Sequence, residues 1–92
     1  MTRNRFERVN EAADDALTLL IGMNNGEVVG AVNCPAAATE GRLPKDYASD
    51  AMPAKAAFRS AIKLANELKV ALVVMDPQNV WPADWGDLYS EN

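Results

Sequence analysis

Two adjacent segments in the second half of the chain carry different hydrophobic periodicities. Between residues 51 and 68, apolar side chains recur at steps of three and four, which places them on one face of a helix. That face consists of Ala51, Ala54, Phe58, Ala61, Ile62, Ala65 and Leu68, widened by Ala57 and Leu64. Residues 70–75 are apolar at consecutive positions, as in a strand that is central in a sheet or covered on both faces. The pattern predicts a helix that leads directly into a buried strand.

The predicted buried face of this helix is mostly alanine. Because small side chains let a helix axis come close to a sheet, we expect the helix to lie flat on one. Ser49 or Asp50 is expected to cap its N-terminus, and Pro53 falls in the first turn, where a missing N–H is tolerated. Asp76 followed by Pro77 is typical of a type I turn and is expected to end the strand.

The first half of the chain allows two interpretations. In one, residues 17–23 and 27–33 pair as a hairpin across the three-residue loop Asn24-Asn25-Gly26, whose final glycine suits a type I turn with a G1 bulge. In the other, a helix continues through Ile21, because six apolar residues also fit one helical face: Phe6, Val9, Ala13, Ala16, Leu17 and Leu20. We favour the hairpin, since the strand predicted from residue 27 onward needs a neighbour.

The remaining segments give weaker signals. Residues 3–9 are expected to form a short edge strand or the first turn of a helix, and residues 10–15 favour a helix with Asn10 as its cap. Residues 34–47 form a long connection broken by prolines and a glycine. Pro82 can open a short helical turn near the end of the chain. That turn would bring three aromatic side chains roughly to one side: Trp81, Trp85 and Tyr89.

Length and composition limit the fold class. The chain has 92 residues, 49% of them hydrophobic and 24% charged, which is typical of one small globular domain spanning residues 1–92. Together with the periodicities, this predicts an α+β fold: a small, mostly antiparallel sheet, built from a hairpin or meander, with one long helix packed on one face. The expected order is β(β)β-α-β.

The net charge and the cysteine content indicate which partners and which cellular compartment to expect. The formal net charge is −4 and the pI is about 4.6, so nucleic acid is not expected as a partner. Cys34 is the only cysteine, so no internal disulfide can form. The sequence shows no membrane-spanning run, and its first residues lack the apolar core of a signal peptide. We therefore expect a cytoplasmic protein without a membrane partner.

Several chemistries are excluded or weakly supported. The chain contains no histidine, which removes Ser–His and Cys–His catalysis and nearly all common zinc sites. Cys34 is better interpreted as an inert side chain at a strand end than as a nucleophile. The glycines at 22, 26 and 30 fit neither the dinucleotide fingerprint nor the phosphate loop. The sequence indicates no catalytic residue, metal or cofactor.

Two groups of side chains remain as candidate contact sites. Lys55, Arg59 and Lys63 form a basic stripe on the exposed helix face, which either contacts an anionic partner or is simply solvated. Large aromatic residues gather near the C-terminus and either close the core or form an interface: Trp81, Trp85 and Tyr89. The sequence therefore favours a non-enzymatic interaction or assembly module that forms a homodimer, with any other partner unknown. The alternative is a small-ligand-binding or enzymatic domain that uses the 34–47 connection and the Asp/Trp-rich tail.

Overall fold

The computed structural model of the protein describes residues 5–11 and 13–89. Within these residues the chain forms an α+β fold, as the sequence predicts. The elements in chain order are β1 (Arg5–Arg8), β2 (Leu17–Asn24), β3 (Glu27–Cys34), the 3-10 helix η1 (Ala36–Thr39), β4 (Tyr47–Ala48), β5 (Met52–Pro53), α1 (Ala54–Leu68), β6 (Leu72–Met75), the 3-10 helix η2 (Ala83–Trp85) and β7 (Asp87–Tyr89).

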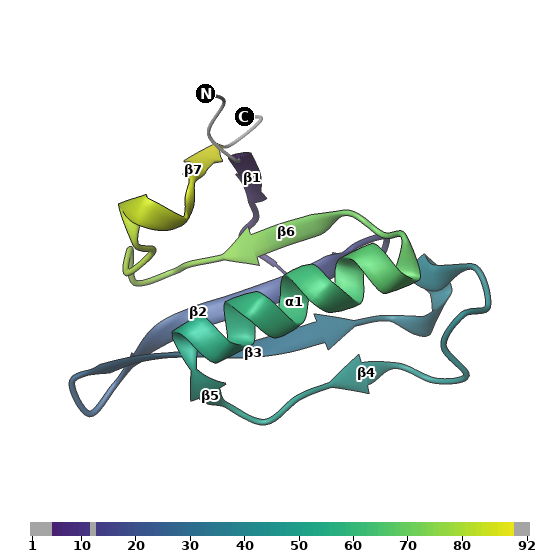
Figure 1. Cartoon of the computed structure of the whole chain (residues 1–92), viewed down its shortest axis with the longest axis horizontal. Coiled ribbons are helices and arrows are strands. Elements are labelled where there is room, and N and C mark those ends of the chain that lie inside the picture. The colour runs from purple at the N-terminus through teal and green to yellow at the C-terminus, as the bar shows by residue number, and fades with distance from the viewer. Residues whose placement is uncertain (1–4, 12, 90–92) are drawn as a thin grey trace.

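The seven strands of the described residues form one sheet in the order β4-β3-β2-β6-β1-β7, and β5 also pairs with β3 (Figure 1). Strand β3 is antiparallel to β2, β4 and β5, whereas β6 is parallel to both of its neighbours and β1 is parallel to β7. The sheet is thus mixed rather than mostly antiparallel. Parallel pairing of β2 with β6 needs a crossover connection, and α1 forms part of it because it lies between β5 and β6 in the chain. The central place of β6 accounts for its continuous apolar sequence.

The hairpin between β2 and β3 is confirmed, and the helical alternative through Ile21 is wrong. The hairpin loop has two residues rather than the predicted three, because Asn24 pairs with Glu27. The loop residues Asn25 and Gly26 have φ values of 53° and 82°, which is the signature of a type I′ turn. This turn type matches the right-handed twist of the paired strands, so the hairpin closes without a bulge.

Helix α1 begins three residues later than predicted. Met52 and Pro53 continue as β5, so neither Ser49 nor Asp50 caps the helix. The Ser49 hydroxyl instead accepts a hydrogen bond from the Val32 N–H at 2.9 Å and holds the chain along β3. Ala51, which the periodicity placed on the buried helical face, lies outside the helix and is exposed.

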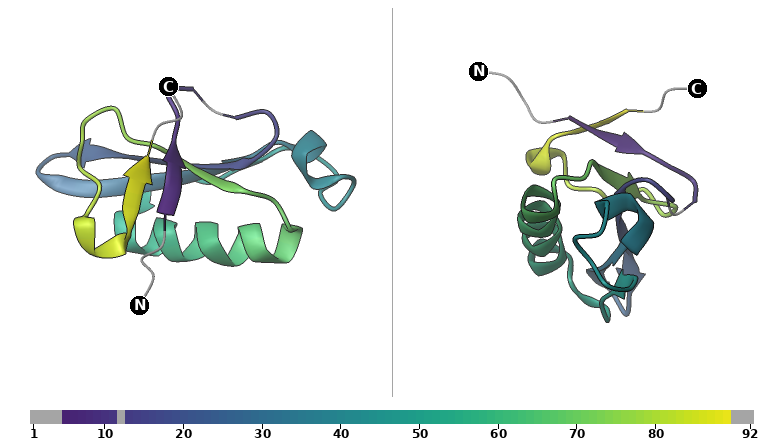
Figure 2. Two further views of the ribbon diagram at one scale, coloured as in Figure 1. Left: turned by 90° about the horizontal axis from the view of Figure 1, so that it is seen from above. Right: turned by 90° about the vertical axis from the view of Figure 1, so that its right-hand side faces the viewer.

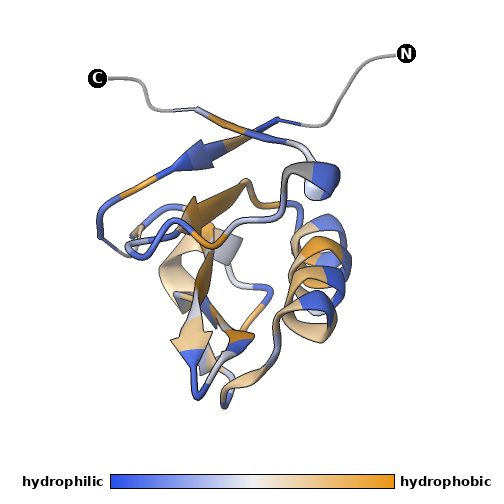
Figure 3. Cartoon of the chain, turned by 90° about the vertical axis from the view of Figure 1, so that its left-hand side faces the viewer, coloured by the Kyte–Doolittle hydropathy of each residue, from blue (hydrophilic) through white to orange (hydrophobic). Residues whose placement is uncertain are grey.

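The core lies between α1 and one face of the sheet. The helix buries its alanine face and Leu68 against Leu17, Leu19 and Ile21 of β2 and against Val32 of β3. The helix lies so close to β3 that a Cβ added at Gly30 would be 2.8 Å from the Ala57 Cβ. Figure 3 shows apolar residues gathered on the central strands, while α1 alternates between apolar and hydrophilic residues. The expectation that this helix lies flat on a sheet is confirmed.

The N-terminal segment differs most from its prediction. β1 is neither an edge strand nor a helical turn, because it lies between β6 and β7. β7 is a strand that the sequence pattern did not reveal. In the described part of residues 10–15 the chain is not helical. There the Ala13 N–H donates to the Thr18 hydroxyl at 3.0 Å, which holds this link against β2.

Candidate functional site

The face of the sheet opposite α1 carries apolar side chains that the helix does not cover. Leu20 of β2 points away from the core residues Leu17, Leu19 and Ile21 because side chains alternate along a strand. It pairs with Ala31 of β3 and with Met75 of β6. Val29 lies two residues before Ala31 in β3 and therefore on the same face of the sheet. We call the surface formed by Leu20, Val29, Ala31 and Met75 the open sheet face. Leu20 is 41% exposed, which is high for a leucine within a sheet.

Among the described residues, the side of the sheet opposite α1 is covered at the end where Thr18 and Val73 lie. Thr18 and Val73 lie on the same side of the sheet as Leu20, yet both are buried. The bond from the Ala13 N–H to the Thr18 hydroxyl places the link between β1 and β2 over this end. Figure 2 shows the link and α1 on opposite sides of the sheet. The open sheet face is therefore the part that the link does not reach.

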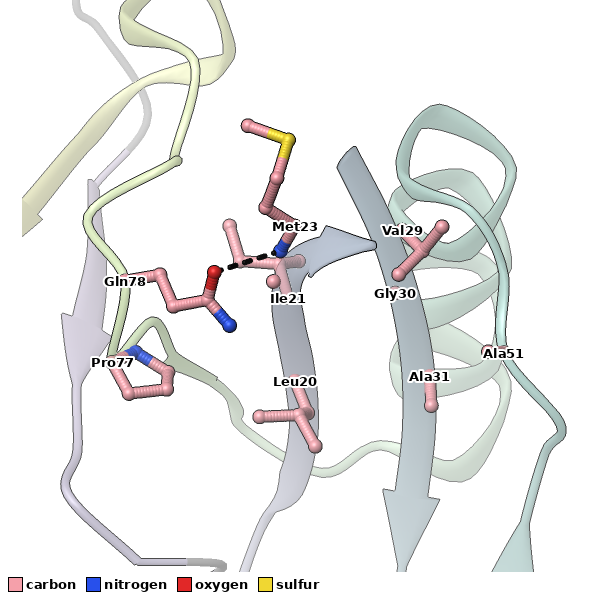
Figure 4. A pocket seen from close by; sticks show the side chains of 10 residues that line it. Leu20, Ile21, Met23, Val29, Gly30, Ala31, Ala51, Pro77 and Gln78 are labelled. Atoms are coloured by element: carbon pink, nitrogen blue, oxygen red, sulfur yellow. Dashed lines mark hydrogen bonds between the residues drawn. The ribbon is translucent and has the colours of Figure 1, made fainter. Parts of the chain in front are cut away.

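A depression of about 360 Å³ lies on this face at the end nearer the hairpin turn (Figure 4). Its lining residues are Leu20, Ile21, Gly22, Met23, Val29, Gly30, Ala31, Ala51, Pro77 and Gln78. Gln78 is the one among them with a polar side chain, and none is charged. Its Oε1 atom accepts a hydrogen bond from the Met23 N–H at 3.2 Å. The depression is thus an apolar surface with a single oriented amide.

Asp76 positions the turn that carries Gln78. Asp76 is 2% exposed, and its carboxylate accepts two backbone hydrogen bonds, from the N–H of Val80 at 2.9 Å and of Trp81 at 3.0 Å. Its carbonyl oxygen accepts from the Arg8 guanidinium at 2.6 Å and from the Asn79 N–H, as expected for the predicted turn. Asp76 is therefore satisfied within the chain and acts structurally.

The aromatic residues near the C-terminus pack against α1. Trp85 stacks on Phe58 with ring centroids 4.6 Å apart, and Trp81 meets both rings edge-on at 5.4 Å. The Trp81 indole N–H donates to the Gly86 carbonyl at 3.0 Å. The predicted helical turn after Pro82 is present as η2. Tyr89, in contrast, lies in β7 under the Arg5 guanidinium at 4.7 Å. The structure brings the two tryptophans together and separates Tyr89 from them.

The basic stripe lies where the periodicity placed it. Lys55, Arg59 and Lys63 are all exposed on the solvent side of α1, one turn apart from each other. The stripe and the open sheet face are on opposite sides of the sheet, so the structure does not bring these two candidate surfaces together.

The connection between β3 and β4 is tied down by its own hydrogen bonds. The buried Thr39 hydroxyl donates to the Ala36 carbonyl at 2.8 Å and accepts from the Leu43 N–H at 3.0 Å. The Asp46 carboxylate accepts from the Ala36 N–H at 2.8 Å. Cys34 is fully buried, and this burial, aided by the negative charge of Asp46, raises the pKa of its thiol. A buried neutral thiol is a poor nucleophile.

Sequence reasoning did not find the open sheet face or Gln78. The apolar residues Leu17, Leu19 and Ile21 occupy every second position of the segment, as in a strand with one buried face. Leu20 stands at one of the positions between them, where this pattern predicts a polar residue, so the second apolar face was not recognised. No local signal marks Gln78, whose partner Met23 is 55 residues away. Such a contact follows only from the tertiary arrangement.

Comparison with known proteins returned no match to a protein-family model, a curated protein or a solved structure. Among the residues that the structure describes, no helix is long and apolar enough to cross a bilayer. The same residues contain no group of three or more cysteine, aspartate or glutamate side chains that could hold a metal ion.

Proposed function

We propose that this chain is a non-enzymatic interaction module that forms a homodimer through the open sheet face. The exposure of Leu20 at the centre of an apolar sheet surface carries this proposal. A sheet with a helix on one face has to bury its other apolar face in some way, and contiguous exposed apolar patches mark interaction sites. A second copy presents the same patch, and a twofold arrangement of identical patches is the commonest symmetric solution.

A stable dimer contact would have to extend beyond the four residues of the open sheet face. The molecule measures 36 × 32 × 25 Å, and Figure 1 looks down its shortest axis. Treated as an ellipse with the two longer axes, the outline of the whole molecule projects to roughly 900 Å², whereas each partner buries roughly 800 Å² in a standard interface. A stable dimer contact would therefore be centred on the open sheet face and extend over most of this broad side.

The aromatic residues near the C-terminus are a weaker choice of interface. Stacking on Phe58 and the bond to Gly86 already engage Trp85 and Trp81 within the chain. We therefore place the dimer contact on the opposite side of the sheet. A cytoplasmic location remains part of this proposal, supported by Cys34, a single buried thiol without a disulfide partner.

Replacing Leu20 by Asp tests the proposal. We expect the variant to be a monomer by size-exclusion chromatography with light scattering, because the dimer would bury an unpaired carboxylate. Tyr47→Asp is the matched control, since Tyr47 is 40% exposed and lies in β4, away from the patch. Circular dichroism should report the same fold for both variants. A wild-type protein that stays monomeric at high concentration would refute the dimer.

A further inference from the structure

One hydrogen bond orients the amide of Gln78, an exposed residue of the turn after β6. The Met23 N–H is a donor, so the Gln78 atom that faces it at 3.2 Å must be the oxygen. The amide nitrogen then turns toward the sheet above Gly22. It lies 3.2 Å from the position that a Cβ on Gly22 would occupy, which is on the same side as Leu20. Glycine at this position leaves the space beside the amide nitrogen free.

The surroundings of this amide have the chemistry of a small-molecule site. Such sites have volumes of about 300–1,000 Å³ and apolar linings, with few polar groups that orient the ligand. The depression, at about 360 Å³, has an apolar lining from two strands, Ala51 and Pro77. Gln78 supplies the one side-chain polar group, and its Nε2 hydrogens carry partial positive charge. Figure 4 shows the Gln78 amide beside the apolar side chains of the lining. An oxygen acceptor would complement its Nε2 hydrogens.

We propose that this depression binds a small, neutral, mainly apolar molecule that carries a carbonyl oxygen, with the Gln78 Nε2 group donating to that oxygen. A carboxylate fits less well, because no lining residue is positively charged and the chain has a net charge of −4. Removing a carboxylate from water without a cation as partner is costly. The apolar part of the ligand would cover Leu20, Val29 and Ala31.

This inference goes beyond the homodimer and does not depend on it. The two proposals share Leu20, so a bound ligand and a second copy would compete for the same surface. The two failures are distinguished by scoring ligand binding where light scattering reports the monomer, and by scoring ligand-induced dissociation where it reports the dimer.

The experiment uses 6-propionyl-2-(dimethylamino)naphthalene, a neutral fluorescent ketone whose emission moves to the blue in apolar surroundings. It is titrated against the wild-type protein over a dilution series, with light scattering at each protein concentration. We expect saturable binding with a blue shift. Gln78→Glu keeps an oxygen for the Met23 N–H but removes the donor, so we expect about tenfold weaker binding, equivalent to about 1.4 kcal/mol.

Asn66→Asp is the matched control, because it makes the same amide-to-carboxylate change at an exposed position of α1. Its affinity for the ketone should equal that of the wild type. Two results would overturn the proposal. One is that the ketone neither binds the monomer saturably nor shifts a dimer toward the monomer, and the other is a Gln78→Glu variant that binds as tightly as the wild type. Neither result bears on whether Leu20→Asp separates a dimer.

Discussion

Gly30 is the position where the close approach of α1 to the sheet can be tested most directly. Gly30 lies in β3 and is buried beneath the helix. A Cβ built there would lie 2.8 Å from the Ala57 Cβ and 3.3 Å from the Leu20 carbonyl oxygen. Carbon atoms pack best at about 3.5–4.0 Å. Gly30→Ala therefore forces α1 and β3 apart or distorts one of them.

The size of the effect follows from two opposing contributions. Overpacking a well-packed core costs about 1–3 kcal/mol. Alanine loses less backbone entropy than glycine on folding, which returns about 0.4–1 kcal/mol. Taking the midpoints of these two ranges, we expect Gly30→Ala to lower the free energy of unfolding by about 1.3 kcal/mol. For a domain of this size, each 1 kcal/mol lowers the melting temperature by about 4–8 °C.

Gly22 provides a matched control in the partner strand. Its added Cβ would meet only the flexible end of Gln78, at 3.2 Å, on the opposite face of the sheet. Gly22→Ala should therefore change the free energy of unfolding by less than about 0.5 kcal/mol. Both variants are measured by urea denaturation followed by circular dichroism, with the slope of the transition compared to confirm two-state unfolding.

Ala57→Gly in the Gly30→Ala background identifies the clash. Alone, Ala57→Gly should cost about 1 kcal/mol in helix propensity and about 0.8 kcal/mol in lost burial. Together, the two changes move one methyl group from the helix to the strand. The double variant should therefore lose at least about 1 kcal/mol less stability than the sum of the losses of the two single variants. A Gly30→Ala variant as stable as Gly22→Ala, or strictly additive effects in the double variant, would refute the close packing of α1 on β3.

Two further predictions concern the end of α1 and the buried thiol. Lys69 ends the helix with φ 57°, and its backbone N–H donates to the Ala65 carbonyl. Because glycine adopts this left-handed conformation without strain, Lys69→Gly should raise the free energy of unfolding by about 0.5–1 kcal/mol, whereas Glu67→Gly within the helix should lower it by about 1 kcal/mol. Urea denaturation that ranks the two variants the other way would contradict this. Because burial raises the pKa of the Cys34 thiol, the unfolded chain releases this proton at a lower pH than the folded chain, and stability should decline as the pH rises above about 8.5. Cys34→Ala should decline less over that range, and identical pH profiles of unfolding would count against the buried thiol.

The elements that the sequence predicted well are those whose signal is local and long. α1 spans 15 residues with a regular apolar face, and the β2–β3 hairpin is closed by Asn25 and Gly26, which tolerate positive φ. The start of α1 was misplaced because the periodicity was extended through Pro53. The residue before a proline is disfavoured in the helical region, so Met52 carried a local signal for an extended backbone.

The strands that the sequence misjudged are short and pair with distant segments. β1 has four residues and β7 three, too few for alternation to be visible. Their pairing partners are fixed by tertiary contacts, for example Glu7 beside both Val73 and Tyr89. The strand conformation of such a short segment is stabilised mainly by packing against the neighbouring strands, which the local sequence does not reveal.

The early end of β6 explains why the candidate site exists at all. β6 stops at Met75, opposite Leu20, while β2 continues for four more residues. Beyond that point no strand of the described residues pairs with β2 along the edge that β6 occupies, and the Met23 N–H donates instead to the Gln78 side chain. A side chain satisfies the hydrogen bond but does not cover the sheet as a strand and its flanking residues would. The depression therefore begins where β6 ends, beside Leu20, whose own side chain is exposed because the link between β1 and β2 does not reach it. Since Leu20 belongs both to the depression and to the open sheet face, a ligand and a second copy would compete for it.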